Sequence, residues 1–88
     1  MKSNKSPHSD EIKIKIIQFF SENPASIDSA RGIAAWIGES IENVKDCLEG
    51  LEKDKIVNAI KTNFVTGYSL TREKNILKKI KEKYLKKK

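Results

Sequence analysis

Residues 33–57 read IAAWIGESIENVKDCLEGLEKDKIV, a pattern of two helices separated by a short turn. Apolar side chains recur at helical spacing on each side of Gly38, and this spacing is typical of amphipathic helices. Gly38 follows Ile37 directly, at the place where a glycine in the left-handed conformation commonly ends a helix. The sequence therefore predicts one helix that ends at Ile37 and another that starts after Ser40 and runs to about Lys53.

Each of these two helices has one apolar face. The first helix is predicted over residues 29–37, with Asp28 or Ser26 as its N-cap. Its apolar face consists of Ala30, Ile33, Ala34 and Ile37. The second helix has a longer apolar face, made of Ile41, Val44, Cys47, Leu48 and Leu51. We expect both apolar faces to enter one core and both polar faces to lie in water.

A third helix is predicted upstream, from about Asp10 to Glu22. Ser9 fits its N-cap, and the acidic side chains of its first turn suit the positive end of the helix dipole. The core face contains Ile12, Ile16, Phe19 and Phe20, with Ile17 at its edge. Ile14 points away from this face, so a second apolar contact is expected there. Asn23-Pro24 ends the helix.

The segment after residue 55 changes from helical to β pattern. Residues 56–61 and 67–70 are predicted as two strands joined by a turn over residues 62–66. A last helix is predicted from Arg72 to about Leu85, with Thr71 as its cap. Its apolar stripe consists of Ile76, Leu77, Ile80 and Tyr84, and lysines fill most of the other positions.

This order of elements is that of a winged helix-turn-helix, in which a β-hairpin follows the helix-turn-helix. The predicted class is therefore mainly α with a small β-hairpin: a three-helix core, a two-stranded wing and a C-terminal helix. We expect residues 1–8 to be a tail, residues 9–71 to form the winged-helix domain and residues 72–88 to form the lysine-rich helix. The outer face of the helix after Ser40 would be left free to enter a DNA groove.

Positive charge is concentrated at the C-terminus. The chain of 88 residues has a net charge of +6, to which residues 72–88 contribute +7 and residues 1–71 contribute −1. Attraction to nucleic acid or another anionic surface is expected mainly from that last segment. No apolar run approaches the roughly 18 residues of a membrane span, and no secretory signal is recognisable at the N-terminus, so we expect a cytoplasmic protein.

The residues that would support catalysis or metal binding are not found together. The sequence has no phosphate-binding glycine loop and no Ser-His-Asp set. A single cysteine, Cys47, excludes an internal disulfide, and one cysteine with the distant His8 does not make a metal site. Cys47 is expected in the core rather than as a nucleophile, and Trp36 as an anchor at the edge of the core. We expect no cofactor and no enzyme.

The same segments resemble a known family. Residues 33–57 are similar to winged-helix transcriptional regulators of the MarR and ArsR type. The similarity lies in the Ile33-Ala34 pair, the glycine turn, the spacing of the apolar residues in the second helix, and the sequence KDKIV that leads from that helix into the strand. GYSLT at residues 67–71 is similar to the strand that closes the wing in those regulators. The resemblance covers about residues 10–71 and consists of core positions. It implies double-stranded DNA as the partner and the helix after Ser40 as the recognition helix.

The resemblance also implies which residues contact DNA. On the recognition helix these are Ser40, Glu42, Asn43, Lys45 and Asp46. Asn43 suits an adenine, and Glu42 or Asp46 can accept a hydrogen bond from a cytosine amino group. Outside that helix, contacts of the wing with DNA and contacts with the backbone phosphates are expected from Arg31, Lys61, Thr62, Asn63, Thr66, Arg72, Lys74 and Lys78.

Two alternatives follow from the residues themselves. Residues 39–55 contain six acids and three lysines, so the predicted recognition helix approaches a polyanion against repulsion. The alternative function is therefore a winged-helix module that binds a protein through its acidic third helix. The second question is the state of assembly. A homodimer would cover Ile14, Ile76, Leu77, Ile80 and Tyr84, whereas in a monomer the last helix would fold back over the first helix.

Overall fold

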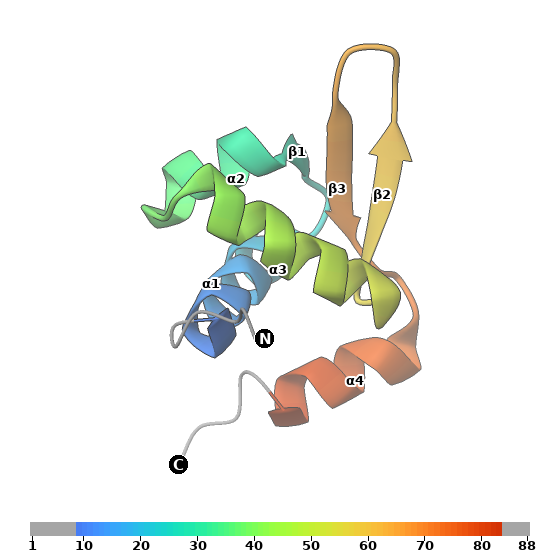
Figure 1. Ribbon diagram of the computed structural model, residues 1–88. Helices are drawn as coiled ribbons and strands as arrows, with labels where there is room; N and C mark the ends of the chain where they lie inside the picture. The colour runs from blue at the N-terminus through green and yellow to red at the C-terminus, as the bar shows by residue number, and fades with distance from the viewer. Residues whose placement is uncertain (1–8, 84–88) are drawn as a thin grey trace.

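The computed structural model describes residues 9–83, and these form the predicted winged helix (Figure 1). The elements in chain order are α1 (Ser9–Glu22), β1 (Ile27–Ser29), α2 (Ala30–Ile37), α3 (Ile41–Lys53), β2 (Val57–Lys61), β3 (Thr66–Leu70) and α4 (Lys74–Lys83). Tyr84 and Leu85 of the predicted last helix lie outside the described residues, as does the predicted N-terminal tail.

The core lies where α1, α2, α3 and the sheet meet. Ile16, Ile17 and Phe20 of α1 are completely buried, as are Val44, Leu48 and Leu51 of α3. Ile33 and Ala34 bring α2 into the same cluster, and Val57, Tyr68 and Leu70 bring in the sheet. The predicted core faces are confirmed with one exception, because Ile41 in the first turn of α3 is 44% exposed.

Gly38 and Ser40 fix the turn between α2 and α3, and Ser29 fixes the start of α2. Gly38 has φ +74° and ends α2, with its N–H donating to the carbonyl of Ala34 at 2.8 Å. The hydroxyl of Ser40 caps α3 by accepting from the N–H of Asn43 at 3.1 Å. Ser29 caps α2 by accepting from Gly32 N–H at 3.1 Å. The prediction of Asp28 or Ser26 as that cap was wrong, because residues 27–29 form a strand and α2 starts at Ala30.

The sheet has three strands in the order β1-β3-β2, all antiparallel. The predicted hairpin is confirmed, with Val57 opposite Leu70 and Lys61 opposite Thr66. Strand β1 was not predicted, since three residues have no readable alternation. It pairs with β3 from Ile27 opposite Ser69 to Ser29 opposite Gly67, so the N-cap residue of α2 also belongs to the sheet.

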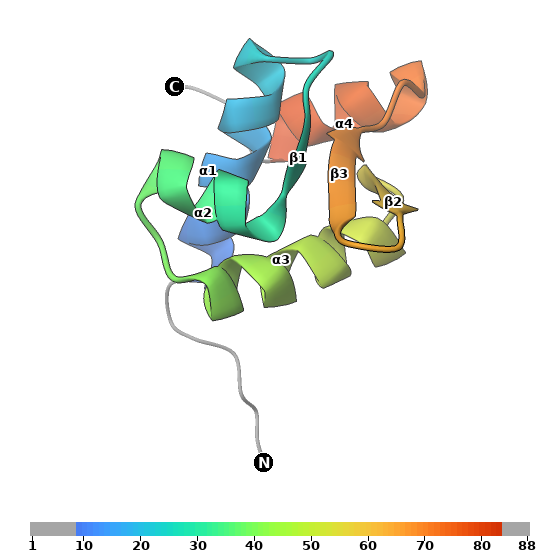
Figure 2. The same cartoon turned by 90° about the horizontal axis from the view of Figure 1, so that it is seen from above.

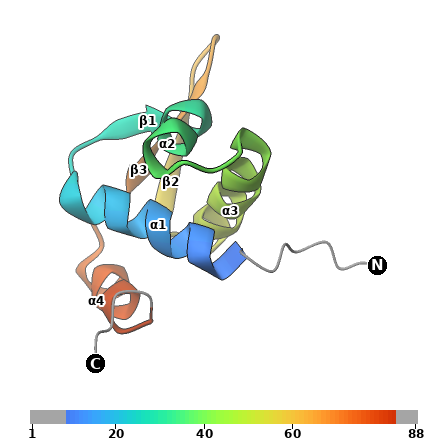
Figure 3. The same ribbon diagram turned by 90° about the vertical axis from the view of Figure 1, so that its left-hand side faces the viewer.

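Helix α4 packs against the side of α1 that is remote from α2 (Figures 1 and 3). Ile80 is 3% exposed within the single chain, and Ile76 and Leu77 are half-buried against the core. Thr71 is buried just before the helix: its N–H donates to the carbonyl of Ile56 at 2.9 Å and its hydroxyl accepts from Glu73 N–H at 3.1 Å. The helix starts at Lys74, two residues later than predicted.

Replacing Gly38 tests the backbone of the turn without steric interference. A Cβ at Gly38 would meet nothing within 4 Å, so Gly38→Ala should cost only the left-handed conformation, about 1 kcal/mol of unfolding free energy. Gly38→Asn is the matched control and should cost less, since Asn tolerates this conformation. Urea unfolding gives both values, and an alanine variant as stable as the parent would contradict the geometry.

Lys55 provides the opposite case, because it is a non-glycine residue at φ +64°. Lys55→Gly should therefore leave stability unchanged or raise it by up to about 1 kcal/mol, since the strain and the entropy of glycine act in opposite directions. Lys53→Gly, in the last turn of α3, should lower the unfolding free energy by about 1 kcal/mol. Equal losses in the two variants would show that residue 55 is not in the left-handed region.

Ile80 reports on the docking of α4. Ile80→Ala should lower the unfolding free energy by about 2–5 kcal/mol, because the side chain is buried within one chain. Lys79→Ala, on the exposed side, should change it by less than about 0.5 kcal/mol. The loss should be independent of protein concentration; a loss that varies with dilution would place Ile80 between two copies.

Candidate nucleic-acid interface

Helix α3 presents its outer face along one side of the molecule, with α1 and the sheet behind it (Figure 2). The five residues predicted for the recognition helix all lie there and are exposed: Ser40, Glu42, Asn43, Lys45 and Asp46. They do not have equal roles, because the Ser40 oxygen already accepts the N–H of Asn43. The side chains of Glu42, Asn43, Lys45 and Asp46 are the ones that α3 offers to a partner.

The outer face of α3 is acidic. Residues 39–55 have a net charge of −3. One of the acids, Glu39, is held by Lys15 of α1, with Nζ and Oε2 2.6 Å apart and the Glu39 side chain only 23% exposed. Sequence reasoning missed this ion pair, since its partners are 24 positions apart. The remaining acids, Glu42, Asp46, Glu49, Glu52 and Asp54, are exposed.

The tip of the wing is closed by Thr62. Its hydroxyl oxygen accepts the N–H groups of Phe64 at 3.2 Å and Val65 at 3.1 Å and donates to the carbonyl of Val65 at 2.8 Å. The backbone N–H of Thr62 donates to the same carbonyl at 3.0 Å. The hydroxyl of Thr62, which was predicted to contact DNA, is therefore engaged within the turn.

The other wing residues are at the surface. Lys61 and Asn63 are exposed, and Thr66 is half-buried. Sequence reasoning did not single out Phe64, which is 94% exposed at the tip. Its place in a four-residue turn between two strands is a signal that could have found it, because a tip residue is remote from any core.

The cationic residues assigned to phosphate contacts fall in separate places. Arg31 on α2 and Lys61 on β2 are exposed, as are Arg72, Lys74 and Lys78 at and after the end of the sheet. Figures 2 and 3 place α4 on the side of the molecule away from α3. The structure therefore does not bring Lys74 and Lys78 onto the face formed by α3 and the wing tip.

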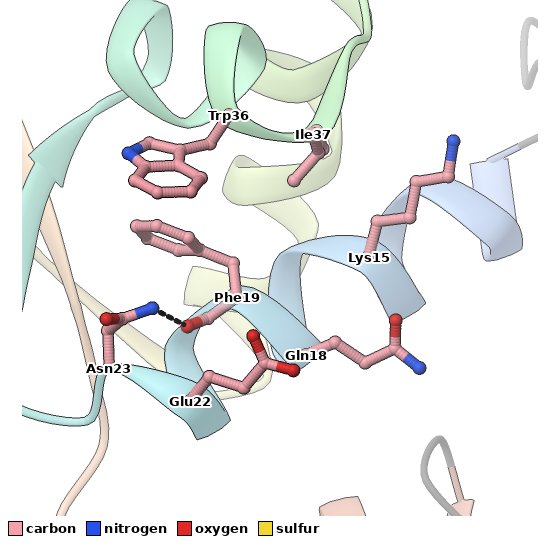
Figure 4. A pocket seen from close by; sticks show the side chains of 7 residues that line it. All are labelled: Lys15, Gln18, Phe19, Glu22, Asn23, Trp36 and Ile37. Carbon is pink, nitrogen blue, oxygen red and sulfur yellow. Dashed lines mark hydrogen bonds between the residues drawn. The ribbon is translucent and has the colours of Figure 1, made fainter.

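A second surface lies between α1 and α2, around Trp36 (Figure 4). Trp36 is 71% exposed and covers Phe19, with ring centroids 5.8 Å apart and the rings inclined at 44°. The expected anchor at the core edge thus has most of its ring in solvent. A cavity of about 220 Å³ is lined by Lys15, Gln18, Phe19, Glu22, Asn23, Trp36 and Ile37. Its mixture of aromatic, acidic and basic side chains differs from the outer face of α3.

Cys47 lies in the core, as predicted, and is 5% exposed. Burial raises the pKa of its thiol above the ordinary value, and the positive charge of Lys13 opposes this only in part. Among residues 9–83 no group of three metal-ligating side chains comes together. Within the same residues no helix has the length and hydropathy to cross a membrane.

The fold defined by these elements is the winged helix, and solved structures with that fold are similar to it. Lactococcus lactis ZitR, as a cysteine-to-serine variant in complex with DNA, matches at TM-score 0.54 and 20% identity over 96% of this chain. A second structure, described as a zinc-responsive MarR family member, also Lactococcus lactis ZitR, matches at TM-score 0.53 and 17% identity over 97% of this chain.

The chain spans 57% and 59% of the two ZitR chains, respectively. No protein-family model matches the sequence, and no curated protein does. At this level of identity the two neighbours establish the winged-helix fold, in agreement with the resemblance seen in the sequence.

The buried thiol makes stability dependent on pH. Because the pKa of Cys47 is higher in the folded than in the unfolded chain, the stabilisation is complete below the ordinary value of 9.0 and declines as the pH rises through the folded value. Urea unfolding should thus show a loss of unfolding free energy as the pH rises above about 9.0, and this loss should be smaller in Cys47→Ala. Tyr68, whose pKa burial also raises, contributes equally to both proteins, so identical pH profiles would refute the assignment to Cys47.

Proposed function

We propose that this protein is a DNA-binding winged-helix regulator of transcription. The observation that carries the proposal is the placement of α3, whose inner face is fully buried and whose outer face is exposed beside a projecting wing. This arrangement is the one by which winged helices place a helix in the major groove. The similarity to ZitR, which was solved in complex with DNA, supports it.

Asn43 is the residue of α3 best suited to read a base. It is exposed in the first turn, and its amide can donate to and accept from an adenine at the same time. Lys45 suits a guanine, and Glu42 or Asp46 suits a cytosine amino group. Acidic residues repel the phosphates at every sequence, and only where this hydrogen bond forms is the repulsion offset, so they select sequence at the expense of general affinity.

Phosphate contacts come from cations on more than one side of the domain. Lys61 and Asn63 flank the wing tip, and Arg31 lies on the helix before the turn. Arg72, Lys74 and Lys78 lie on the side of α4 and would contact backbone that bends around the domain or belongs to another segment of DNA. Two copies of the chain, joined through Ile14 and the half-buried Ile76 and Leu77, would give such a longer binding surface.

The second candidate is a protein-interaction module with no catalytic role. It is favoured by the acidic outer face of α3 and by Trp36, whose indole ring lies exposed over the α1–α2 cavity. A basic partner with an apolar anchor would complement both features. The two candidates differ in the residues on which binding depends, namely Asn43 and Lys61 for DNA and Trp36 for a protein.

Salt dependence tests the first proposal. Fluorescence anisotropy with a labelled duplex of mixed sequence should show binding that weakens steeply between about 50 and 200 mM salt, with a slope of about −0.9 in log–log form for each neutralised phosphate. Replacement of Arg72, Lys74 and Lys78 by glutamine should reduce the magnitude of that slope by about 2 to 3. Absence of salt-dependent binding by the full chain would exclude the DNA-binding function.

Base reading requires a separate variant. With a duplex enriched from a random pool, Asn43→Ala should weaken binding by about 5- to 150-fold, the range for loss of one good base contact, and should leave the salt slope unchanged. Trp36→Ala is the matched control, because it removes another exposed side chain from a different surface. The reverse result, in which only Trp36→Ala affects binding to a partner, would favour the protein-interaction module.

A further inference from the structure

The tip of the wing carries an unsupported aromatic ring. Phe64 is 94% exposed, more than any other large apolar side chain among the described residues, and Val65 beside it is 53% exposed. The two strands carry the turn beyond the helices, so the ring lies at the far end of a projection (Figure 1). Such exposure has no benefit for folding, because a side chain that stays in water gains no burial.

The backbone on both sides of Phe64 is held by the hydrogen bonds of the turn. The Thr62 hydroxyl oxygen accepts hydrogen bonds from the N–H groups of Phe64 at 3.2 Å and Val65 at 3.1 Å. The Val65 carbonyl accepts two further hydrogen bonds, from the Thr62 hydroxyl at 2.8 Å and from the Thr62 N–H at 3.0 Å. These four bonds fix the backbone on both sides of Phe64, so little backbone entropy is lost when the tip meets a partner.

The charges around the tip suit an anionic partner. Residues 56–71 contain no acidic residue, and Lys61 precedes the turn. The adjoining α3 is acidic, so the wing is the part of the α3 face with the most favourable approach to phosphates. An apolar ring flanked by a lysine and by Asn63 therefore has the composition of an element that enters a minor groove, where the walls are sugar and base edges.

The geometry points to Phe64 as an apolar wedge that enters the DNA minor groove and partly unstacks one base step. This inference rests on the proposed DNA-binding function and adds to it a residue that distorts the duplex. Phenylalanine wedges of this kind kink DNA by about 20–90°. Pyrimidine–purine steps such as TA unstack most easily, so the wedge gives a preference for TA steps beneath the wing without any hydrogen bond to a base.

The test uses the full chain and an alternating AT duplex in which some adenines are replaced by the fluorescent base 2-aminopurine. Binding of the parent should raise 2-aminopurine fluorescence, since unstacking relieves quenching. Phe64→Ala should bind about tenfold more weakly, as expected for loss of one aromatic–base stacking contact, and should lose the fluorescence rise. Phe64→Leu keeps an apolar wedge and should retain part of that rise, whereas Trp36→Ala should behave like the parent.

The outcomes distinguish failure of the proposed DNA-binding function from failure of the Phe64 wedge alone. If the parent binds no duplex in a salt-dependent manner, the DNA-binding function fails and the wedge fails with it. If the parent binds but Phe64→Ala matches it in affinity and fluorescence, the wedge alone is excluded. Sedimentation of the free proteins is the further measurement: a parent that self-associates and a Phe64→Ala variant that does not would assign the ring to a protein contact and overturn the wedge. Thermal unfolding should be the same for the parent, Phe64→Ala and Phe64→Leu, because Phe64 makes no buried contact.

Discussion

The burial of one face of α3 against α1 is the interaction on which the rest of the structure depends. Val44, Leu48 and Leu51 are completely buried, as are Ile16 and Phe20 of α1. With its inner side fixed in this way, α3 cannot rotate about its axis without exposing those side chains to water, at a cost of about 1.5–3 kcal/mol for each. The direction in which Asn43 and its neighbours point is therefore set by core packing and not by any partner.

The same packing explains how far the sequence could predict the fold. The faces of α1, α2 and α3 were predictable because their apolar residues recur at helical spacing, and Gly38 marked the turn because its conformation excludes most other residues. Strand β1 was not predictable, since Ile27–Ser29 is a strand only through its pairing with a strand about 40 positions later. Ile41 was placed in the core by its spacing, but the helix starts at that residue, and its side chain lies beyond the edge of the core, 44% exposed.

The candidate site was less predictable than the fold. Residues 40–46 followed from the phase of α3, which the core fixes. The positions of Lys74 and Lys78 did not, because the sequence gives their charge but not the side of the molecule on which α4 packs. The exposure of two aromatic side chains, Trp36 and Phe64, was likewise not predicted from the sequence. Their residue types favour burial, whereas the structure leaves their rings in water, 71% and 94% exposed; only for Phe64 did the sequence hold a sign of this, its place in the turn.

The distribution of charge then determines how a domain of this kind can recognise DNA. Most DNA-binding helices combine reading of bases with attraction to phosphates, but α3 is acidic, so in the proposed function it would supply only the reading of bases. For the proposed DNA-binding function, affinity would have to come from the wing and from cations on other sides of the domain, which cannot all touch one straight segment of duplex. A distorted duplex would bring more of those cations within reach of phosphates, and an apolar residue at the wing tip is the kind of side chain that distorts DNA. Under the DNA-binding function proposed above, the acidic α3, the exposed Phe64 and the remote lysines of α4 fit one arrangement, in which affinity depends on bending and specificity on the helix.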